Sequence, residues 1–295
     1  MKFTNNHGLP RAFVNAIAGD KYTRGDADIS VTELIDSPRI RILSRTFGEN
    51  VTEDVSARAL TLLGQGVHAK LEDANKEGIA EKRFYVEIGG WRLSGGIDLI
   101  EDGILYDYKV TNVAGYQTEG RSGSWEKQTN CYAEMARENG VEVREIRIVV
   151  ILRDFYMSRV GKELNYPDAP AFTVPVRMWT REQAQKYIRE RIILHKQAEA
   201  SVPVCTPEER WVAPTKWAVM SRTSTRRSLR NYDSEADAKS HASADPKKFY
   251  VEQRPGGAVR CRMYCSMNKF CSQYLHEQAQ AAEVSQKEEI ADEVS

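Results

Sequence analysis

The chain has 295 residues, of which 41% are hydrophobic, which is enough for one large domain or two modest ones. Lysine plus arginine and aspartate plus glutamate number 42 each, so the net charge does not indicate a nucleic-acid partner. No stretch approaches the roughly 18 apolar residues of a membrane span, and the first residues lack the apolar run of a signal peptide. We therefore expect a cytoplasmic protein without membrane contact.

The first half of the chain predicts helices followed by a group of strands. Ser37 and Pro38 are typical of a helix start, with Ser as the N-cap and Pro at the first helical position. Apolar residues at helical spacing predict a long helix over Thr52–Gly78. Turns rich in glycine then separate three predicted strands, which span Lys82–Ile88, Trp91–Ile100 and Gly103–Val110.

The second half continues the alternation of helices and strands. A helical pattern over 123–140 precedes a β-branched run over 143–155, which we expect to form a central strand. A further helix is predicted over Thr180–Ser201. Shorter elements follow, namely a strand over Lys216–Ser221, a helix over Ser234–Ser243 and a strand over Phe249–Gln253. The acidic tail from Glu277 is expected to be disordered or a frayed helix.

Two carboxylates and one amine lie close together in the hairpin predicted between Gly95 and Val110. Asp98 and Asp107 occupy consecutive strands about 4.8 Å apart, although strands disfavour aspartate. If the register aligns them, two like charges face each other, which costs energy unless a cation lies between them. Oxygen ligands of this type suit Mg²⁺ or Mn²⁺. Lys109 follows two positions later on the same face, where its ammonium can offset charge on a phosphoryl group.

The alternative is that Asp98 and Asp107 are ordinary polar residues at a sheet edge, with Lys109 as their surface partner. Their neighbours are apolar, however, and a buried charge needs a partner or a function. His68 lies on the predicted helix before the strands, and Gln128 and Tyr132 lie one turn apart on the helix after them. Each of these features alone is more often structural than catalytic.

In combination, these residues form an ordered series: a glycine-histidine motif ending at His68, then G-x-D, D-Y-K and Q-x-x-x-Y. The series resembles the PD-(D/E)XK nuclease superfamily, specifically its RecB-like branch, which includes phage exonucleases and CRISPR-associated nucleases. The resemblance covers about residues 29–155. It implies a three-layer, restriction-endonuclease-like α/β core, with a mixed central sheet flanked by helices, and metal-dependent hydrolysis of DNA.

The resemblance also implies a role for each residue of the series. The expected metal ligands are His68, Asp98, Asp107 and the backbone carbonyl of Tyr108. Lys109 is expected to be the catalytic lysine. Gln128 and Tyr132 are expected to orient the site and to contact the DNA backbone. Phosphodiester chemistry agrees with this set, since one or two metal ions can activate water and neutralise the developing negative charge.

Four of the five cysteines are expected to hold a metal. Cys261, Cys265 and Cys271 form C-x3-C-x5-C, and Cys205 lies well upstream. Four thiolates can hold tetrahedral zinc or an iron–sulfur cluster, and such clustering in a reducing compartment favours metal over disulfides. Cys131 lies apart, inside a helical pattern, and is expected to be a small buried hydrophobe.

The residues alone leave the choice between the two metals open. Zinc sites often use C-x2-C pairs, which this sequence lacks. RecB-like nucleases with one distant cysteine and a C-terminal trio carry a 4Fe-4S cluster, and the arrangement here is similar. In that family the trio is usually C-x2-C-x5-C, whereas the first gap here has three residues. The distant cysteine of the family usually precedes the nuclease motifs, whereas Cys205 follows them. We favour a structural 4Fe-4S cluster, with Zn²⁺ as the alternative.

A basic and aromatic segment over Trp211–Tyr232 is the candidate DNA contact. It carries no acidic residue, and its aromatic side chains can stack on unpaired bases while its cations neutralise phosphates. A solvated loop is the alternative interpretation. The candidate DNA-binding residues are Lys216, Arg222, Arg226, Arg227 and Arg230.

We therefore expect a nuclease core with N-terminal helices over 1–202, a small cysteine-ligated α+β module over 203–276 and an acidic tail over 277–295. The expected function is metal-dependent hydrolysis of DNA, as an exonuclease, in replication, recombination or repair. The expected partners are single-stranded DNA or duplex ends, and a recombination or replication protein. A bacteriophage or bacterial source suits this reading, and a phage protein would act in the host cytoplasm.

Two other functions stay open from the sequence. One is a non-catalytic accessory protein that uses the nuclease fold to hold DNA ends. The loss of Asp107 or Lys109 would mark such a protein, and both residues are present. The other is a redox-sensing iron–sulfur protein built on the same fold, which the sequence does not specifically favour.

Overall fold

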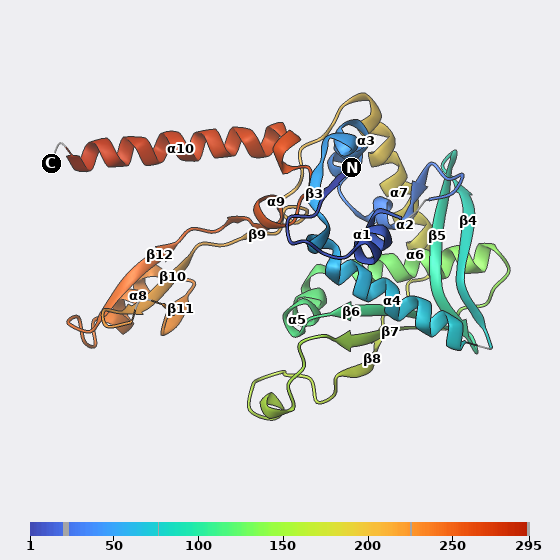
Figure 1. The fold of residues 1–295 in the computed structure, drawn as a ribbon, viewed down its shortest axis with the longest axis horizontal. Helices are drawn as coiled ribbons and strands as arrows, with labels where there is room; N and C mark the ends of the chain where they lie inside the picture. The colour runs from blue at the N-terminus through green and yellow to red at the C-terminus, as the bar shows by residue number, and fades with distance from the viewer. Residues whose placement is uncertain (20–23, 76, 225, 294–295) are drawn as a thin grey trace. The chain divides into compact units, whose positions relative to one another are not determined.

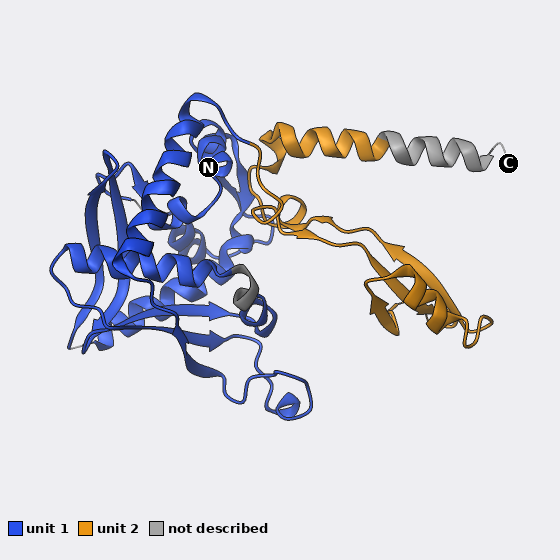
Figure 2. Ribbon diagram, turned by 180° about the vertical axis from the view of Figure 1, so that it is seen from behind, with its two compact units in different colours: residues 1–203 blue, residues 204–295 orange. Residues whose placement is uncertain are grey.

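The computed structural model describes residues 1–19, 24–75, 77–224 and 226–293 of the chain (Figure 1). The chain divides into two compact units, unit 1 over residues 1–203 and unit 2 over residues 204–295 (Figure 2). Unit 1 is a mixed α/β structure whose central mixed sheet is flanked by helices. Unit 2 is a smaller α+β unit that contains four of the five cysteines. Among the described residues, no helix is both long and apolar enough to cross a membrane.

The central sheet has the strand order β2–β5–β6–β7–β8, and β4 pairs with the same β5. Neighbouring strands are antiparallel, except that β2 runs parallel to β5 and β6 runs parallel to β7. The three strands predicted before residue 111 are confirmed, and so is the internal position of β7. The strands are β2 (Ile29–Ser30), β4 (Ile79–Ile88), β5 (Trp91–Glu101), β6 (Ile104–Thr111), β7 (Glu145–Leu152) and β8 (Ala171–Val176).

The turn between β5 and β6 determines which residues of these strands are opposite each other. Asp102 and the glycine after it have φ values of 50° and 76°, as a two-residue type I′ turn requires and as Asp-Gly favours. The ladder that starts at this turn ends at the pair of Leu99 with Tyr106. Asp98 and Asp107 occupy the next position of the same register, where the ladder has ended.

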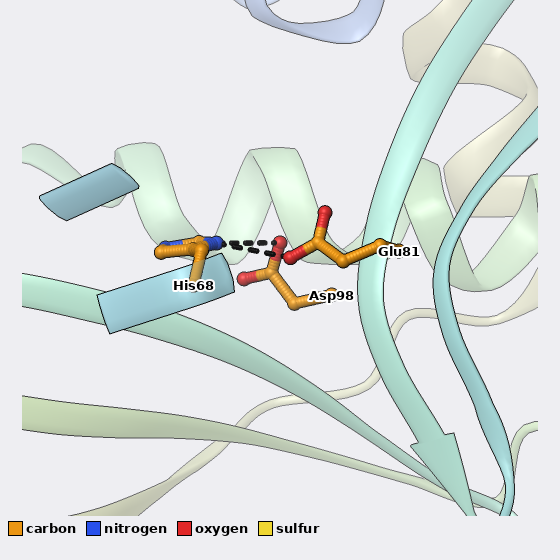
Figure 3. Close-up of side chains that lie close together, drawn as sticks. All are labelled: His68, Glu81 and Asp98. Atoms are coloured by element: carbon orange, nitrogen blue, oxygen red, sulfur yellow. Dashed lines mark hydrogen bonds and ion pairs between the residues drawn. The ribbon is translucent and has the colours of Figure 1, made fainter. Parts of the chain in front are cut away.

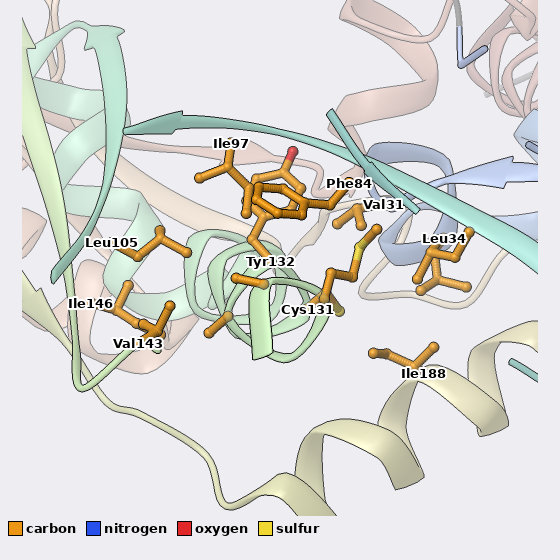
Figure 4. Close-up of a cluster of buried hydrophobic side chains, with 14 of the residues drawn as sticks. Val31, Leu34, Phe84, Ile97, Leu105, Cys131, Tyr132, Val143, Ile146 and Ile188 are labelled. Atoms are coloured by element: carbon orange, nitrogen blue, oxygen red, sulfur yellow. The ribbon is translucent and has the colours of Figure 1, made fainter. Parts of the chain in front are cut away.

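Helices cover both faces of the central sheet. Side chains of α2, α6 and α7 pack with those of the strands in one core, which includes the buried Cys131 as expected (Figure 4). α4 lies on the other face, because Tyr108 alternates with Asp107 along β6 and the Tyr108 ring contacts His68 of α4. The helices of unit 1 are α1 (Arg11–Ala18), α2 (Val31–Ile35), α3 (Pro38–Phe47), α4 (Ala59–Ala74), α5 (Val113–Ser122), α6 (Ser124–Glu138) and α7 (Arg181–Ala200).

The long helix predicted over Thr52–Gly78 begins later and ends earlier than expected, since α4 spans Ala59–Ala74. Its first residues, Thr52–Asp54, form β3, which pairs in parallel with β1 (Lys2–Thr4). A short 3₁₀ turn follows, in which the Asp54 carboxylate accepts a hydrogen bond from a backbone amide, and α4 starts at Ala59. The pairing partner lies some fifty residues upstream, so a pattern of local apolar spacing could not reveal this strand.

A buried histidine joins α7 to α2 and α3. Nδ1 of His195 accepts a hydrogen bond from Arg41 Nε at 3.0 Å, since a guanidinium can only donate. Nε2 therefore carries the proton and donates to the carbonyl oxygen of Leu34 at 3.1 Å. Burial, reinforced by the positive charges of Arg191 and Arg41, lowers the pKa of His195 to about 4.

We expect the protein to lose stability as the pH falls from about 6.5 to about 4, because of His195. The unfolded state binds a proton on this ring near pH 6.5, whereas the folded state resists it, so the contribution is complete above pH 6.5. The expected loss is about 1–3 kcal/mol. Urea unfolding at pH 7.5 and at pH 5 would measure it, with His195→Gln as the comparison. An equal loss in this variant, which lacks the titrating ring, would contradict the assignment.

Unit 2 contains a three-stranded antiparallel sheet of order β11–β10–β12, and α8 packs against it. The predicted strands and helix between 216 and 253 are confirmed. The segment from Glu277, for which disorder or a frayed helix was expected, belongs to α10 as far as Glu293, and residues 294–295 lie outside the described chain. The elements are β9 (Val212–Ala213), β10 (Lys216–Ser221), β11 (Arg230–Tyr232), α8 (Glu235–Ala242), β12 (Phe249–Arg254), β13 (Gly257–Ala258), α9 (Val259–Met263) and α10 (Ser272–Glu293).

Candidate metal centre and catalytic residues

Three potential metal ligands from three different elements converge beside β6 (Figure 3). His68 comes from α4, Glu81 from β4 and Asp98 from β5. The Nδ1 atom of His68 lies 3.2 Å from Glu81 Oε1 and 3.4 Å from Asp98 Oδ1. Within the described residues, this is the one group of three or more histidine, cysteine, aspartate or glutamate side chains whose ligand atoms all lie within 4.8 Å of one another.

The end of the β5–β6 ladder makes room for this group. The backbone amide of Tyr108 donates its hydrogen bond to Asp98 Oδ2 at 2.7 Å, so a side chain takes the place of a ladder partner. The carbonyl oxygen of Tyr108 lies 3.2 Å from His68 Nε2. Both backbone groups of one residue of β6 are therefore satisfied by the candidate site.

Glu81 is the member of the group that the sequence did not reveal. Its φ of 44° lies in the left-handed region, which costs a residue other than glycine roughly 1 kcal/mol. β4 and β5 keep one register on both sides of Glu81, but Glu81 itself and the opposite Asp98 form no ladder pair. A strained residue at such a break is a reason to look for a function. In the sequence, Glu81 is one charged residue in a charged strand, and no local signal distinguishes it.

The electrostatics of the group centre on His68. The atoms nearest its two ring nitrogens are all acceptors, namely two carboxylate oxygens and one backbone carbonyl, so the ring donates from both sides. Hydrogen bonds to Asp98 and then Glu81 raise the pKa of His68 to about 10. The imidazolium thus balances part of the charge of two neighbouring carboxylates.

Asp107 and Lys109 start a second chain of contacts, on the face of the sheet that α6 covers. Lys109 Nζ lies 2.6 Å from Asp107 Oδ2 and donates to Gln128 Oε1 at 3.0 Å. Gln128 Nε2 in turn donates to the hydroxyl of Tyr132 at 2.9 Å. Asp107 is only 2% exposed, and its burial raises its pKa, an effect that the Lys109 ammonium opposes. The predicted sharing of one face by Asp107 and Lys109 is confirmed.

The structure does not place Asp107 within the group of His68, Glu81 and Asp98. Its carboxylate is paired with Lys109, although the charge of Asp98 is close enough to raise the Asp107 pKa further. The two aspartates of the predicted pair thus stand in adjoining parts of the site. They occupy matching positions of the register, but the ladder ends before them, and Asp98 contacts His68 and the Tyr108 amide while Asp107 contacts Lys109.

A glycine in β5 provides the space for Tyr132. A Cβ atom on Gly95 would lie 2.8 Å from the Tyr132 ring and 3.2 Å from the sulfur of Met135. The contact with the ring is shorter than real Cβ contacts, so a larger residue would displace α6 from the sheet or rotate the tyrosine. The hydrogen-bonded chain from Tyr132 to Lys109 therefore depends on the absence of a side chain at this position.

The four cysteines of the predicted cluster lie in unit 2. Cys205, Cys261 and Cys271 are buried and Cys265 is half-buried. The side chain of Gln273, two residues after Cys271, makes hydrogen bonds of 2.8 and 3.1 Å with the backbone of Cys205. Although all four cysteines are described, no three of their sulfurs lie within 4.8 Å of one another. Ligands of one tetrahedral zinc ion would be about 3.8 Å apart, from the Zn–S distance of about 2.3 Å.

The candidate DNA-binding residues of unit 2 differ in their surroundings. Lys216 forms an ion pair with Asp233. Arg222 and Arg230 lie over tyrosine rings, at 5.4 and 5.1 Å from the ring centroids. Arg226 and Arg227 are exposed, and neither lies over an aromatic ring of the described residues.

No protein-family model matches the chain, and the comparison with curated proteins gives no match. Among solved structures, the protein SSO0001 is similar with a TM-score of 0.46 and 15% identity, over 68% of this chain and 87% of that one. A candidate exonuclease from Eubacterium rectale has a TM-score of 0.33 and 11% identity, over 55% and 62% of the two chains. A phage-related exonuclease from Haemophilus somnus has a TM-score of 0.30 and 12% identity, over 64% and 87%.

Proposed function

We propose that the protein is a divalent-metal-dependent deoxyribonuclease, acting as an exonuclease. The observation that carries the proposal is the convergence of His68, Glu81 and Asp98 next to the buried pair of Asp107 and Lys109. Hydrolysis of a phosphodiester requires an activated water and a positive environment for the developing charge. Carboxylates that hold a cation, beside a fixed ammonium group, are suited to both requirements.

The donor set fits Mg²⁺ or Mn²⁺. Carboxylate and carbonyl oxygens are the ligands these ions prefer, and one imidazole is compatible with Mn²⁺. The proposed ligands are His68, Glu81, Asp98 and the carbonyl oxygen of Tyr108, with Asp107 at the side of Lys109. The ion, when bound, supplies a Lewis acid for a phosphoryl oxygen and lowers the pKa of bound water.

The chain's own residues would hold the positive charge of Lys109 in place. Asp107 and Gln128 contact its ammonium from two sides, and the Tyr132 hydroxyl holds the Gln128 amide. We propose that Lys109 contacts the phosphoryl oxygens of DNA as a catalytic residue. Gln128 and Tyr132 act through it as positioning residues, and the preorganised geometry avoids a reorganisation cost during the reaction.

We also propose that Cys205, Cys261, Cys265 and Cys271 bind a structural 4Fe-4S cluster, with Zn²⁺ as the alternative. The hydrogen bonds of Gln273 to the Cys205 backbone support a common site for the distant cysteine and the trio. A metal centre bound by these four cysteines would stabilise unit 2, because it would close the long segment between Cys205 and Cys261.

DNA is the proposed partner, as single strands or duplex ends, in replication, recombination or repair. The arginines of unit 2 would contribute to it through phosphate contacts, and the stacking of Arg222 on Tyr250 presents a flat cationic surface to nucleic acid. A recombination or replication protein is the proposed second partner, and the RecB-like branch is the proposed family.

Cleavage of end-labelled linear DNA, single-stranded and duplex, with a circular control, tests the proposed activity. We expect cleavage of the linear forms in Mn²⁺ or Mg²⁺, no cleavage of circles, and none after chelation. Asp98→Asn should reduce the rate to background. Asp73→Asn, which changes an exposed carboxylate on α4, should leave it unchanged. Absence of cleavage by the metal-loaded protein would overturn the nuclease and favour the DNA-end-binding accessory protein.

A further inference from the structure

A pocket of about 670 Å³ opens on the face of the central sheet that carries Asp107 and Lys109. Its volume is in the range of small-molecule sites, roughly 300–1,000 Å³. The walls come from α5, the start of α6, the loop after β7, and β8. Residues that define them are Tyr116, Trp125, Leu164, Asn165, Val174 and Arg177.

The register of the sheet aligns this pocket with the candidate catalytic residues. Asp107 pairs with Ile148 of β7, and Ile148 pairs with Val174 of β8. Directly opposite residues on neighbouring strands point to the same face, so Asp107 and Val174 belong to one row on one face. They are two strands apart, a separation of about 10 Å.

Helix α6 connects the pocket to the site a second time. Trp125, which lines the pocket, precedes Gln128 by three residues, so the two side chains share one face of the helix. Gln128 accepts the hydrogen bond from Lys109. The pocket is therefore one helical turn from the partner of Lys109 along α6, and two strands from Asp107 across the sheet.

The side chains around the pocket are of the types that proteins use to bind single-stranded nucleic acid. Trp125 and Tyr116 offer aromatic surfaces for a base. The guanidinium of Arg177 is exposed and forms no hydrogen bond or ion pair with the described residues, so it is available to a phosphate. Leu164 is 89% exposed, an apolar side chain left in solvent at the pocket wall. Among the lining residues that the structure describes, Glu126 is the single acidic one, and one of its oxygens accepts a hydrogen bond from the Trp179 indole at 2.6 Å.

We propose that this pocket binds a nucleotide of the DNA strand adjacent to the phosphate that is cleaved. The base stacks on the aromatic wall formed by Trp125 and Tyr116, and a backbone phosphate contacts Arg177. The inference rests on the proposed nuclease function and adds a subsite to it. A separation of about 10 Å from Asp107 lies within reach of the nucleotides next to a phosphate held at the carboxylates.

Fluorescence anisotropy with the full-length protein tests the subsite. The probe is a labelled single-stranded oligonucleotide of about 12 nucleotides, a length within the usual span of single-strand sites, in EDTA to prevent cleavage. We expect Arg177→Gln and Trp125→Leu to raise the Kd about fivefold or more. Arg189→Gln, which removes an exposed arginine of α7 outside the pocket, should leave the Kd unchanged. Because Trp125 packs against the core, the exposed Arg177 gives the decisive variant if Trp125→Leu does not fold.

An abasic residue placed at each position of the probe in turn locates the stacked base. The affinity of the wild-type protein should fall when the abasic residue occupies one particular position of the probe. The affinity of the Trp125→Leu protein should not depend on the position of the abasic residue. If the wild-type protein binds and cleaves DNA and both pocket variants keep its affinity, the proposed subsite is wrong but the proposed nuclease activity is not. Binding that depends on the pocket, without cleavage in metal, would support the subsite and overturn the nuclease. No binding of wild type to DNA would overturn both.

Discussion

Replacing Lys109 with methionine is expected to reduce the rate of DNA cleavage about 10²–10³-fold while the affinity for DNA changes little. The methionine keeps most of the length and the apolar body of the side chain, but removes the charge that lies between Asp107 and Gln128. A group that acts on charge developing in the transition state affects the rate more than binding. Single-turnover cleavage with saturating protein and Mn²⁺ would measure the rate, and anisotropy in EDTA would measure the affinity.

The matched control for this experiment is Lys70→Met, which removes an exposed ammonium from α4. The control should cleave at the wild-type rate. A thermal unfolding curve is needed beside it, because Lys109→Met leaves the buried Asp107 without its cation and favours the protonated carboxyl. A folded Lys109→Met protein that cleaves as fast as wild type would contradict the catalytic role of the lysine.

The second large effect is expected at Glu81, in metal binding measured without DNA. Glu81→Gln should weaken Mn²⁺ binding at least about tenfold, because it removes one anionic oxygen ligand from the group with His68 and Asp98. The amide has nearly the same shape, so the backbone at this position need not change. Isothermal titration of the chelator-treated protein with MnCl₂ would give the affinity, and Glu77→Gln, near the start of β4, is the matched control.

Wild-type Mn²⁺ affinity in Glu81→Gln would mean that Glu81 is only a hydrogen-bond partner of His68. Asp98→Asn helps to decide whether Glu81 is a metal ligand or only a partner of His68. Asp98 itself also accepts the hydrogen bond of the Tyr108 amide. If Asp98→Asn abolishes Mn²⁺ binding and Glu81→Gln does not affect it, the site has fewer carboxylate ligands than we propose. Both variants are isosteric, so a loss of affinity in either reports on charge more than on packing.

Much of unit 1 could be predicted from its sequence because the signals are local. The Asp-Gly turn determines the hairpin, and the β-branched run around Ile148 predicts the internal strand. β8 is not among the predicted strands; its residues alternate between exposed and half-buried, but Pro175 lies within it, and proline is disfavoured inside a strand. The sheet order resolves this conflict, since β8 is at the edge, where a missing amide donor can be tolerated.

The candidate site could be predicted only where spacing along the chain determines geometry. Two positions on one strand place Lys109 beside Asp107, and one helical turn places Gln128 beside Tyr132. The role of Glu81 depends instead on a positive φ at a break in a ladder, which no local pattern records. The pocket likewise combines helices, a loop and an edge strand that only the folded chain brings together.

The parallel pairing of β6 and β7 has a consequence for how such a protein can change its substrate. Parallel neighbours cannot be joined by a tight turn, so the chain must travel back over one face of the sheet before β7 begins. α5 and α6 form this crossover, and it carries Tyr116, Trp125 and Gln128. Insertions or deletions near the junction of the two helices would therefore reshape the pocket while every ladder pair of the sheet survives. Substrate preference could diverge through this connection independently of the carboxylates.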